Sequence, residues 1–394
     1  MIDQKQIKSL TVLGWNFFLH WLKAGKNFIL RKKENQAEKF KGYFKADWIT
    51  ALKPEEAELI YNLGKCTVCG ICDEACLPSF YSQGKFLGPE HLVACAGRSQ
   101  PEFISDLDDF FRCTLCAKCD NICPPQVKIS ELARLMRKWI FRVEPSETWA
   151  IFPEVKKNLD QFGNPFGKEK PVPEQSQTNN GVILFLGCRE MAEGNPEQWI
   201  KLIESLGISA KVISGVCCGG LLEEIGAEGI TPGWEKLLAH NPQKIITICP
   251  HCFYSLSKKL PEKIELKFIL ELIPEGLKIS EKPKEPVVYF DPCFLSRKMN
   301  LGELPRRMMK NLGMELIEME QNSILGDCCG AGGGLFWYDP VMAKRISGKK
   351  IQQAKALGAK TILTECGLCQ NLLQKANSEN NIEIKRLTEL FFKP

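Results

Sequence analysis

The sequence lacks the features that would make it a membrane-spanning or a secreted protein. A stretch dense in apolar and aromatic side chains, residues 10–22, has thirteen residues, whereas a helix needs about twenty to cross a bilayer. The N-terminus has no cleavage-site pattern of a secretory signal peptide. Histidine is scarce, with four among 394 residues: His20, His91, His240 and His251. We therefore expect a cytoplasmic protein with few imidazoles available for proton transfer.

Composition is ordinary in every respect but one. With 44% hydrophobic and 25% charged residues, the chain can bury a core, and its length allows two or three domains. Cysteine is abundant, with 19 residues. In a short secreted chain these cysteines would suggest disulfides, but the length and the missing leader indicate reduced thiols that bind metal.

Eight cysteines form a duplicated run in which every gap is repeated. The copies are Cys66-x-x-Cys69-x-x-Cys72-x-x-x-Cys76 and Cys113-x-x-Cys116-x-x-Cys119-x-x-x-Cys123-Pro124. This spacing is typical of thiolates that hold two cubane [4Fe-4S] clusters, where the fourth cysteine of each run binds the other cluster. The sequence therefore predicts one cluster on Cys66, Cys69, Cys72 and Cys123, and a second on Cys113, Cys116, Cys119 and Cys76.

Ten further cysteines form a second duplication of a different kind. One copy comprises Cys188, Cys217, Cys218, Cys249 and Cys252, and the other comprises Cys293, Cys328, Cys329, Cys366 and Cys369. Five thiolates select iron–sulfur, zinc or copper(I), and spacing alone does not decide among them. The remaining Cys95 is expected to be a small buried side chain.

Positive charge is concentrated at the N-terminus. Residues 1–45 carry ten Lys or Arg against three acidic residues, whereas the net charge of the whole chain is +5. Aromatic side chains flanked by lysines suit the interface between lipid headgroups and acyl chains. We expect residues 5–30 to form a helix on an anionic membrane surface; docking on a partner subunit or on the rest of the chain is the alternative. Nucleic-acid binding is not expected, because no reading element accompanies the charges.

The remaining chain divides by its local patterns. Residues 46–150 show short helical segments around the ferredoxin-type runs, and residues 151–180 are rich in turn formers and are expected to be a linker. Residues 181–283 and 284–394 repeat each other: strands at 182–188, 211–214 and 244–249 match strands at 287–293, 315–318 and 360–366. Strands alternating with helices indicate short parallel sheets, and ligands collect beyond the carboxyl ends of such strands. The predicted fold class is therefore α+β and multidomain: a helical two-cluster ferredoxin domain followed by two α/β cysteine-rich domains.

A glycine follows each adjacent cysteine pair. Two neighbouring thiolates face one metal centre only if the backbone bends sharply, and Gly219 and Gly330 give that freedom. The second copy continues as Gly-Ala-Gly-Gly-Gly334, and we regard Gly332 as part of the same cluster-binding loop, whose amides suit cluster sulfides. A dinucleotide fingerprint is the rival interpretation, but no strand leads into these glycines and the final small residue is missing.

Together these patterns resemble the heterodisulfide reductase catalytic subunits and their relatives, which include iron–sulfur subunits of anaerobic glycerol-3-phosphate dehydrogenase and glycolate oxidase. The resemblance covers about residues 60–380 and is carried by Tyr289-Phe-Asp-Pro-Cys293, Asp327-Cys-Cys-Gly-Ala-Gly-Gly-Gly334 and Cys249-Pro-His-Cys252. It implies two cubane clusters and one or two further [4Fe-4S] clusters of a non-cubane kind in the cysteine-rich domains.

Two departures from the family pattern bear on catalysis. Phe294 stands where the family often has histidine, and Cys366-Gly-Leu-Cys369 stands where it often has Cys-Pro-x-Cys. Losing a proton donor weakens the case for disulfide reduction, which consumes protons. His251 remains as a candidate catalytic proton donor, with a capping or packing role as the alternative.

Three functions compete. The favoured one is an electron-transfer subunit of a membrane-associated oxidoreductase complex at the inner face of the cell membrane. The others are a thiol-disulfide reductase of the heterodisulfide type and a non-enzymatic metal or cluster scaffold. Because no flavin or nicotinamide motif is evident, we expect no flavin or NAD on this chain, and we expect a flavoprotein dehydrogenase or a quinone-linked membrane subunit as partner. Whether the chain is itself an enzyme stays open.

Overall fold

The structure, a computed structural model, describes residues 4–29, 36–43, 52–96, 107–172, 181–378 and 381–392. The chain forms two compact units, residues 1–51 and residues 52–394.

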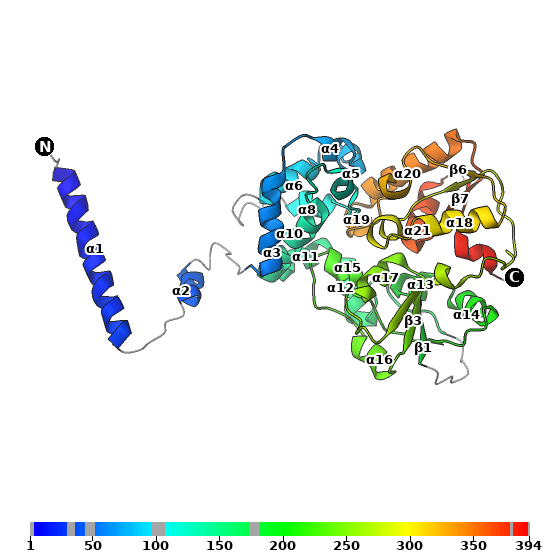
Figure 1. Cartoon of the computed structure of the whole chain (residues 1–394), viewed down its shortest axis with the longest axis horizontal. Helices are drawn as coiled ribbons and strands as arrows, with labels where there is room; N and C mark the ends of the chain where they lie inside the picture. Colours follow the sequence, from blue (N-terminus) through cyan, green and yellow to red (C-terminus); the bar gives the residue numbers. More distant parts are fainter. Residues whose placement is uncertain are drawn as a thin grey trace. The chain divides into compact units, whose positions relative to one another are not determined.

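The described residues of the first unit form two helices, α1 (Gln4–Ile29) and α2 (Gln36–Tyr43), drawn in blue in Figure 1. Helix α1 agrees with the helix expected over residues 5–30. Its large side chains are exposed: Trp15 is 61% accessible, Phe17 73% and Trp21 66%. Apolar and aromatic residues occupy most of the helix circumference, because Leu13, Phe17 and Trp21 follow one line and Trp15, Phe18 and Leu22 follow another. Among the described helices, none has the combined length and hydrophobicity that crossing a bilayer requires.

The second unit begins with short helices, and no strand occurs among its described residues up to 172. The helices are α3 (Pro54–Asn62), η2 (Leu63–Lys65), α4 (Ile71–Glu74), α5 (Leu77–Tyr81), α6 (Pro89–Ala96), α8 (Leu107–Arg112), α9 (Lys118–Ile122), α10 (Ile129–Val143), α11 (Pro145–Ile151) and α12 (Pro153–Phe162). Helix α10 buries Leu132, Met136, Trp139 and Ile140, whose spacing by three and four places them on one face. The helical character expected of this region from the sequence is therefore correct.

The linker expected over residues 151–180 contains a helix that the sequence patterns did not predict. Helix α12 begins at Pro153, which suits the first turn, and is followed directly by Gly163, which adopts a left-handed conformation with φ of +65°. Val155 is fully buried and Leu159 packs on the same core. The prediction was wrong for residues 153–162 because prolines and glycines at the helix ends were taken as turn formers. Residues 173–180 lie outside the described residues.

Two parallel four-stranded sheets follow, and they have the same topology. The first contains β1 (Val182–Phe185), β2 (Lys211–Val212), β3 (Lys244–Thr247) and β4 (Glu265–Phe268) in the order β2-β1-β3-β4. The second contains β5 (Val287–Tyr289), β6 (Leu316–Ile317), β7 (Thr361–Thr364) and β8 (Glu383–Arg386) in the order β6-β5-β7-β8. The expected parallel sheets and their duplication are confirmed, whereas the edge strands β4 and β8 were missed.

Helices connect the strands of each sheet. In the first copy they are α13 (Cys188–Glu193), α14 (Pro196–Ser205), α15 (Gly220–Glu224), α16 (Trp234–Ala239), α17 (Pro250–Ser257) and η3 (Ile269–Leu272). In the second copy they are η4 (Phe294–Lys298), α18 (Glu303–Asn311), η5 (Ser323–Leu325), α19 (Leu335–Tyr338), α20 (Pro340–Ala356), α21 (Gly367–Ala376) and η6 (Leu387–Phe391). Helices therefore alternate with the strands, as the sequence patterns predicted.

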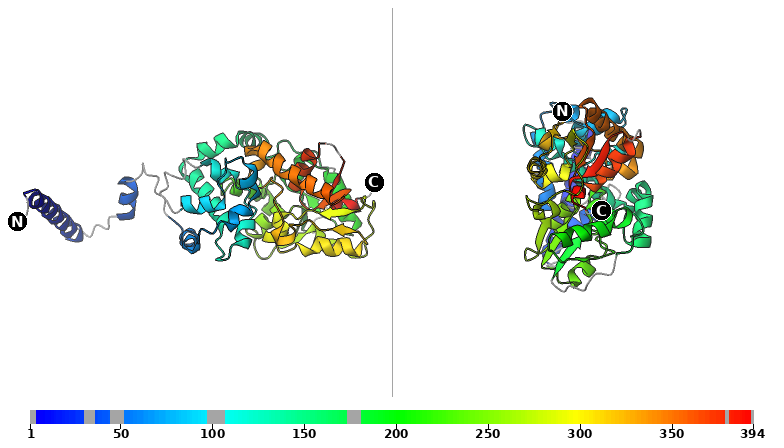
Figure 2. Two further views of the ribbon diagram at one scale, coloured as in Figure 1. Left: turned by 90° about the horizontal axis from the view of Figure 1, so that it is seen from above. Right: turned by 90° about the vertical axis from the view of Figure 1, so that its right-hand side faces the viewer.

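The three parts of the second unit are packed into one body. Figures 1 and 2 show the short helices gathered at one end and the two sheets at the other. One hydrophobic core joins the sheets through Leu184, Ile246, Tyr289 and Leu363, among other residues. A second core joins the helical part to α15 through Leu222 and other residues.

Arg137 lies where three parts meet: the helical part and the two cysteine-rich domains. Its side chain is fully buried and donates hydrogen bonds to the carbonyl oxygens of Cys113, Glu224 and Gly333, one from each part. It also donates from Nε to the carbonyl oxygen of Phe110 at 2.9 Å. A guanidinium group has five donors and no acceptor, so a cluster of carbonyl oxygens suits it. Arg137 therefore fixes the helical part against both sheets.

Candidate metal centres

The second ferredoxin-type run closes around a pocket that also holds the last cysteine of the first run. The pocket is lined by Cys72, Cys76, Cys113, Cys116, Cys119 and Cys328, among other residues. Burial raises the pKa of the Cys76 thiol, and the nearby Cys116 and Cys113 raise it further. Burial also raises the pKa of Cys113 to about 11. The structure thus brings together the four cysteines that the spacing assigns to one cluster: Cys113, Cys116, Cys119 and Cys76.

The cysteines assigned to the other cubane are more open to solvent. Burial raises the pKa of Cys72 to about 12, and Asp73 and Cys66 contribute to that rise. Cys123 packs against the same core as Cys66 and Cys72 and accepts a hydrogen bond from the Val127 amide. Cys69 is the one exposed thiol among the described cysteines. Three of these four residues therefore border one hydrophobic core, and Cys69 lies at the surface.

In the described residues, no three His, Cys, Asp or Glu side chains converge on the position of one metal ion. A four-iron cluster does not need such convergence, because its four cysteine thiolates are distributed over the cluster. A cluster site requires instead that its thiols line a common cavity. The thiols of the second run, together with Cys76, line such a cavity.

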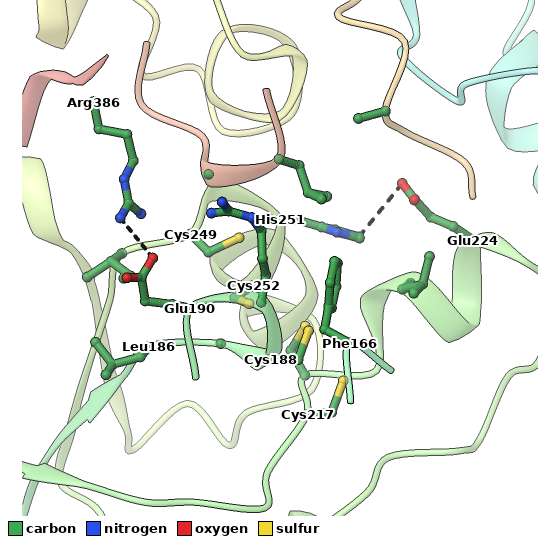
Figure 3. Close-up of a pocket in the computed structure, with 18 of the residues that line it drawn as sticks. Phe166, Leu186, Cys188, Glu190, Cys217, Glu224, Cys249, His251, Cys252 and Arg386 are labelled. Carbon is green, nitrogen blue, oxygen red and sulfur yellow. Dashed lines mark hydrogen bonds and ion pairs between the residues drawn. The ribbon is translucent and has the colours of Figure 1, made fainter. Parts of the chain in front are cut away.

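The first cysteine-rich domain has a pocket of its own, shown in Figure 3. It is lined by all five cysteines of the first set: Cys188, Cys217, Cys218, Cys249 and Cys252. They lie at the carboxyl ends of β1 and β3 and in the loop after β2, as expected for a parallel sheet. Hydrogen bonding by Cys188 and burial raise the pKa of Cys217 above its usual value. A raised pKa means that the buried thiolate is costly. These thiols can therefore lose their protons only when a bound metal compensates the negative charge of the thiolates.

Charged side chains from other elements reach this pocket. His251 Nε2 lies 3.7 Å from Glu224 Oε1, and Arg386 Nη2 donates to Glu190 Oε2 at 2.8 Å (Figure 3). Although burial raises it, the charge of Arg386 holds the pKa of Glu190 below its usual value. Arg386 ends β8 of the second sheet, so this ion pair joins the two cysteine-rich domains. His251, predicted as a proton donor, lies in the pocket lining, and no sequence pattern pointed to its partner Glu224.

The second set of five cysteines lies beside the ferredoxin-type run. The Cys369 and Cys329 sulfurs are 3.1 Å apart. Hydrogen bonds with Cys328 and Cys369 lower the pKa of Cys329, and a hydrogen bond with Cys328 raises that of Cys116. On the other side, a hydrogen bond with Cys369 lowers the pKa of the Cys366 thiol, and the charge of Cys249 opposes that shift. The second set therefore adjoins the ferredoxin-type run at Cys116, and Gly367 and Leu368, which follow Cys366, line the pocket of the first set.

Backbone amides approach the sulfurs of both adjacent cysteine pairs. The Gly219 amide donates to Cys217 Sγ at 3.4 Å, and the Gly330 amide donates to Cys328 Sγ at 3.2 Å. Both glycines have positive φ, +76° and +92°, which residues with a Cβ rarely adopt. Gly332 does not have a positive φ. A Cβ at this position would lie 2.5 Å from the Thr114 carbonyl oxygen, so the role of Gly332 is close packing on the ferredoxin-type run.

Arg297 lies between the ferredoxin-type run and the second set, and it was not among the residues expected from the sequence. Its Nε donates to the Cys116 carbonyl oxygen at 2.7 Å and its Nη1 to that of Gly326 at 2.6 Å. Although burial lowers the pKa of Arg297, the charges of Cys116, Cys293 and Cys328 raise it. Its Nη2 is buried without a partner in the part of the chain that the structure describes. A buried donor facing several thiols fits an acceptor such as a cluster sulfide.

Parallel sheets with cysteines at their strand ends define a class of cysteine-rich iron–sulfur proteins. The cysteine-rich domain family matches residues 182–257 and 287–374. The chain is 25% identical over 308 residues to the EtfAB:quinone oxidoreductase of Syntrophomonas wolfei, covering 68% of this chain and 43% of that protein. It is 24% identical over 283 residues to a subunit of the dihydromethanophenazine:CoB–CoM heterodisulfide reductase of Methanosarcina barkeri, covering 63% and 68%. It is 28% identical over 237 residues to a subunit of the fumarate reductase (CoM/CoB) of Methanothermobacter marburgensis, covering 56% and 46%.

These findings support a heterodisulfide reductase-like iron–sulfur family for the chain, as the sequence patterns suggested. They support iron–sulfur clusters as its cofactors. The chain spans less than half the length of two of the three relatives named above.

Proposed function

We propose that this chain is an iron–sulfur electron-transfer subunit of a membrane-associated oxidoreductase complex. It exchanges electrons between a partner dehydrogenase or quinone-linked subunit and the centres of its cysteine-rich domains. The observation that carries the proposal is the contact between Cys116 of the second ferredoxin-type run and Cys328 of the second cysteine-rich domain. Two sets of metal-binding thiols that touch are favourable for moving electrons between them.

The ligand sets are proposed from the spacing, and for two of the four sets a common pocket supports the proposal. Cys66, Cys69, Cys72 and Cys123 would hold one cubane, and Cys113, Cys116, Cys119 and Cys76 the other. Each cysteine-rich domain would hold a further, non-cubane [4Fe-4S] cluster on its five thiols. When bound, these clusters would accept and release single electrons. The chain's own residues bury the thiols, direct glycine amides at them and place the Arg297 guanidinium between two sets.

The partners are proposed from the names of the relatives and from α1. One relative is named EtfAB:quinone oxidoreductase, which suggests a quinone-linked subunit for this chain, beside the flavoprotein dehydrogenase expected from the sequence. Helix α1 exposes Trp15, Phe17 and Trp21 beside Lys23 and Lys26, a composition that suits an anionic lipid surface. We therefore propose peripheral attachment to the inner face of the cell membrane, with no nucleic-acid partner.

Metal analysis of the full-length protein, purified without oxygen, tests the proposal. We expect about eight irons from the two ferredoxin-type runs, four per cubane, and further iron from the cysteine-rich domains. Cys119→Ser should lower the iron and acid-labile sulfide content, whereas Cys95→Ser, at a buried thiol outside every ligand set, should not. Protein that contains mostly zinc, or equal iron loss in the two variants, would overturn the proposal.

A thiol-disulfide reductase is the second candidate, and the pocket of Figure 3 favours it. Five thiols and the His251–Glu224 pair line one cavity, where a disulfide could take up two electrons and two protons to give two thiols. The test is to mix the reduced holo-protein with a small disulfide and count the thiols formed. Two thiols per disulfide consumed would support a reductase, and none would leave electron transfer as the function.

A further inference from the structure

The two ferredoxin-type loops have the same backbone design. Val68 and Leu115 occupy equivalent positions and both have positive φ, +56° and +52°. One residue beyond the next cysteine, Gly70 and Ala117 again share a left-handed conformation, with φ of +74° and +61°.

The residues that follow the third cysteine of each run also correspond. Asp73 accepts a hydrogen bond from the Glu90 amide at 2.8 Å, and Asp120 accepts one from the Ser130 amide at 2.8 Å. Each carboxylate thus binds the first turn of the next long helix, α6 or α10. Because the two loops have the same backbone conformation, a difference in their exposure comes from the elements that surround them and not from the loops themselves.

The second loop is covered by the cysteine-rich domains. Thr114, Leu115, Ala117 and Lys118 are all buried, and Leu115 is 5% accessible. The cover contributes Arg297, which donates to the Cys116 carbonyl oxygen, and Asp327, which pairs with Lys118. Gly332 adds close backbone packing on Thr114. The second cysteine-rich domain of the same chain thus occupies the outer face of this loop.

The equivalent face of the first loop is exposed. Val68 is 69% accessible and Ile71, which corresponds to Lys118, is 44% accessible. Thr67 and Cys69 between and beside them are exposed as well. A β-branched residue with positive φ is strained, so an exposed valine at position 68 has a conformational cost without any burial to offset it in this unit. Asparagine would meet the backbone requirement more easily.

We infer that the face formed by Val68, Cys69 and Ile71 is the docking surface for a separate redox protein, which exchanges electrons with the centre bound through Cys69. This inference rests on the proposed function and adds the place where the partner binds. The internal duplicate supports it, since the same face of the second loop is covered by a redox domain. The partner would offer an apolar contact for Val68 and Ile71 and an Arg or Lys side chain toward the Cys69 position, the role that Arg297 has at Cys116.

The faces of the two loops also differ in the contact that they require. Lys118 needs the carboxylate of Asp327, whereas Ile71 needs none, so the partner's contact is expected to be apolar at that point. A small apolar contact suits an interaction that forms and dissociates, as encounters between electron-transfer proteins do.

A photo-cross-linker placed at position 71 of the full-length protein in its native cells tests the inference. The matched control is position 341, where Val341 is 60% accessible and apolar but lies on α20, outside the two loops. We expect position 71, and not position 341, to cross-link to a protein that carries flavin, haem or an iron–sulfur cluster. Cross-links to residues 1–51, to a second copy, to lipid or to a protein without a redox group would each overturn it, as would none.

Substitutions then test the exchange of electrons with the protein that was captured. Val68→Asn and Ile71→Glu should slow that exchange by at least about tenfold, because each removes a buried apolar contact. Reduction by a small viologen dye, iron content and the electron paramagnetic resonance spectrum should be unchanged, and Val341→Asn should change nothing. If the dye and iron results hold but exchange is unaffected, the docking surface is wrong and the proposed function stands. If the wild-type protein holds no iron, the proposed function itself fails.

Discussion

Lys118 and Asp327 form a buried ion pair in which Nζ and Oδ1 are 2.6 Å apart. Lys118 lies between two cysteines of the second ferredoxin-type run, and Asp327 immediately precedes the Cys328-Cys329 pair. Lys350 of α20 contacts the other oxygen of the same carboxylate. Although burial raises it, the charges of Lys350 and Lys118 hold the pKa of Asp327 below its usual value. One carboxylate therefore connects two sets of cysteine thiols.

Replacing this carboxylate should destabilise the protein strongly. Asp327→Asn leaves two buried ammonium groups without a counter-charge, and breaking a buried pair in this way costs about 3–5 kcal/mol. The free energy of unfolding, measured by urea titration of the anaerobic holo-protein, should fall by that amount. The control is Glu197→Gln, which breaks the exposed pair with Lys201 and should cost at most about 1 kcal/mol. Equal losses in the two variants would show that the Asp327 carboxylate does not stabilise the protein through its buried ion pairs with Lys118 and Lys350.

The carboxylate of Glu56 should make stability depend on pH. Burial raises the pKa of Glu56, but Arg142, Lys138 and the Lys53 amide outweigh it and lower the pKa from 4.5 to about 2. A depressed folded-state pKa contributes stability above the unfolded pKa, and that stability is lost as pH falls from about 4.5 toward 2. The shift corresponds to about 3 kcal/mol at neutral pH.

Glu56→Gln removes the titration and tests this account. The difference in unfolding free energy between wild type and variant should be constant from pH 8 to about 5.5 and shrink below the unfolded pKa of about 4.5. Glu55→Gln is the control, because Glu55 is the exposed neighbour in the same helix turn. A difference that stays the same down to pH 4 would mean that Glu56 has an ordinary pKa.

Much of the fold could be predicted from local patterns, whereas the contacts between its parts could not. Strands ending at cysteines and their repetition indicated the two parallel sheets. The edge strand Glu265–Phe268 was missed because two apolar residues alternating with charges are too short a pattern. Arg297 and Cys116 are 181 positions apart and Lys118 and Asp327 are 209 apart, so no local pattern contains these contacts. The grouping of cysteines was visible in the sequence, but the order in which the sets adjoin was not.

Helix α1 should determine whether the protein binds lipid. Deleting residues 1–30 removes Trp15, Phe17 and Trp21, which a membrane interface would bury, and should abolish sedimentation with vesicles that contain phosphatidylglycerol. The iron content and visible spectrum of the truncated protein should be unchanged. Exchanging Lys23 and Lys26 for Glu should weaken binding to anionic vesicles by roughly 1 kcal/mol or more per charge. Binding that persists after truncation would place the lipid contact elsewhere.

Arg297 should raise the reduction potential of the centres on either side of it. A reduced cluster carries one more negative charge, and a buried guanidinium beside Cys116, Cys293 and Cys328 stabilises that state. Arg297→Gln removes both the charge and the buried Nη2 donor, and should lower the potential by roughly 50–150 mV, the range expected for one charge about 5–15 Å from the centre of a cluster at an effective dielectric constant near 20.

The comparison of two variants separates charge from hydrogen bonding. Arg297→Lys keeps the charge but cannot reproduce the forked contacts to Cys116, Ile324 and Gly326, so its shift should be smaller than that of Arg297→Gln. Redox titrations followed by electron paramagnetic resonance give the potentials, and Arg306→Gln, which loses its ion pairs with Asp291 and Glu318, serves as control. If Arg306→Gln shifts the potentials as much as Arg297→Gln does, the effect comes from net charge and not from the position of Arg297. A shift confined to Arg297 variants would mean that the guanidinium acts on the centres directly, because its charge lies beside the thiols of Cys116, Cys293 and Cys328.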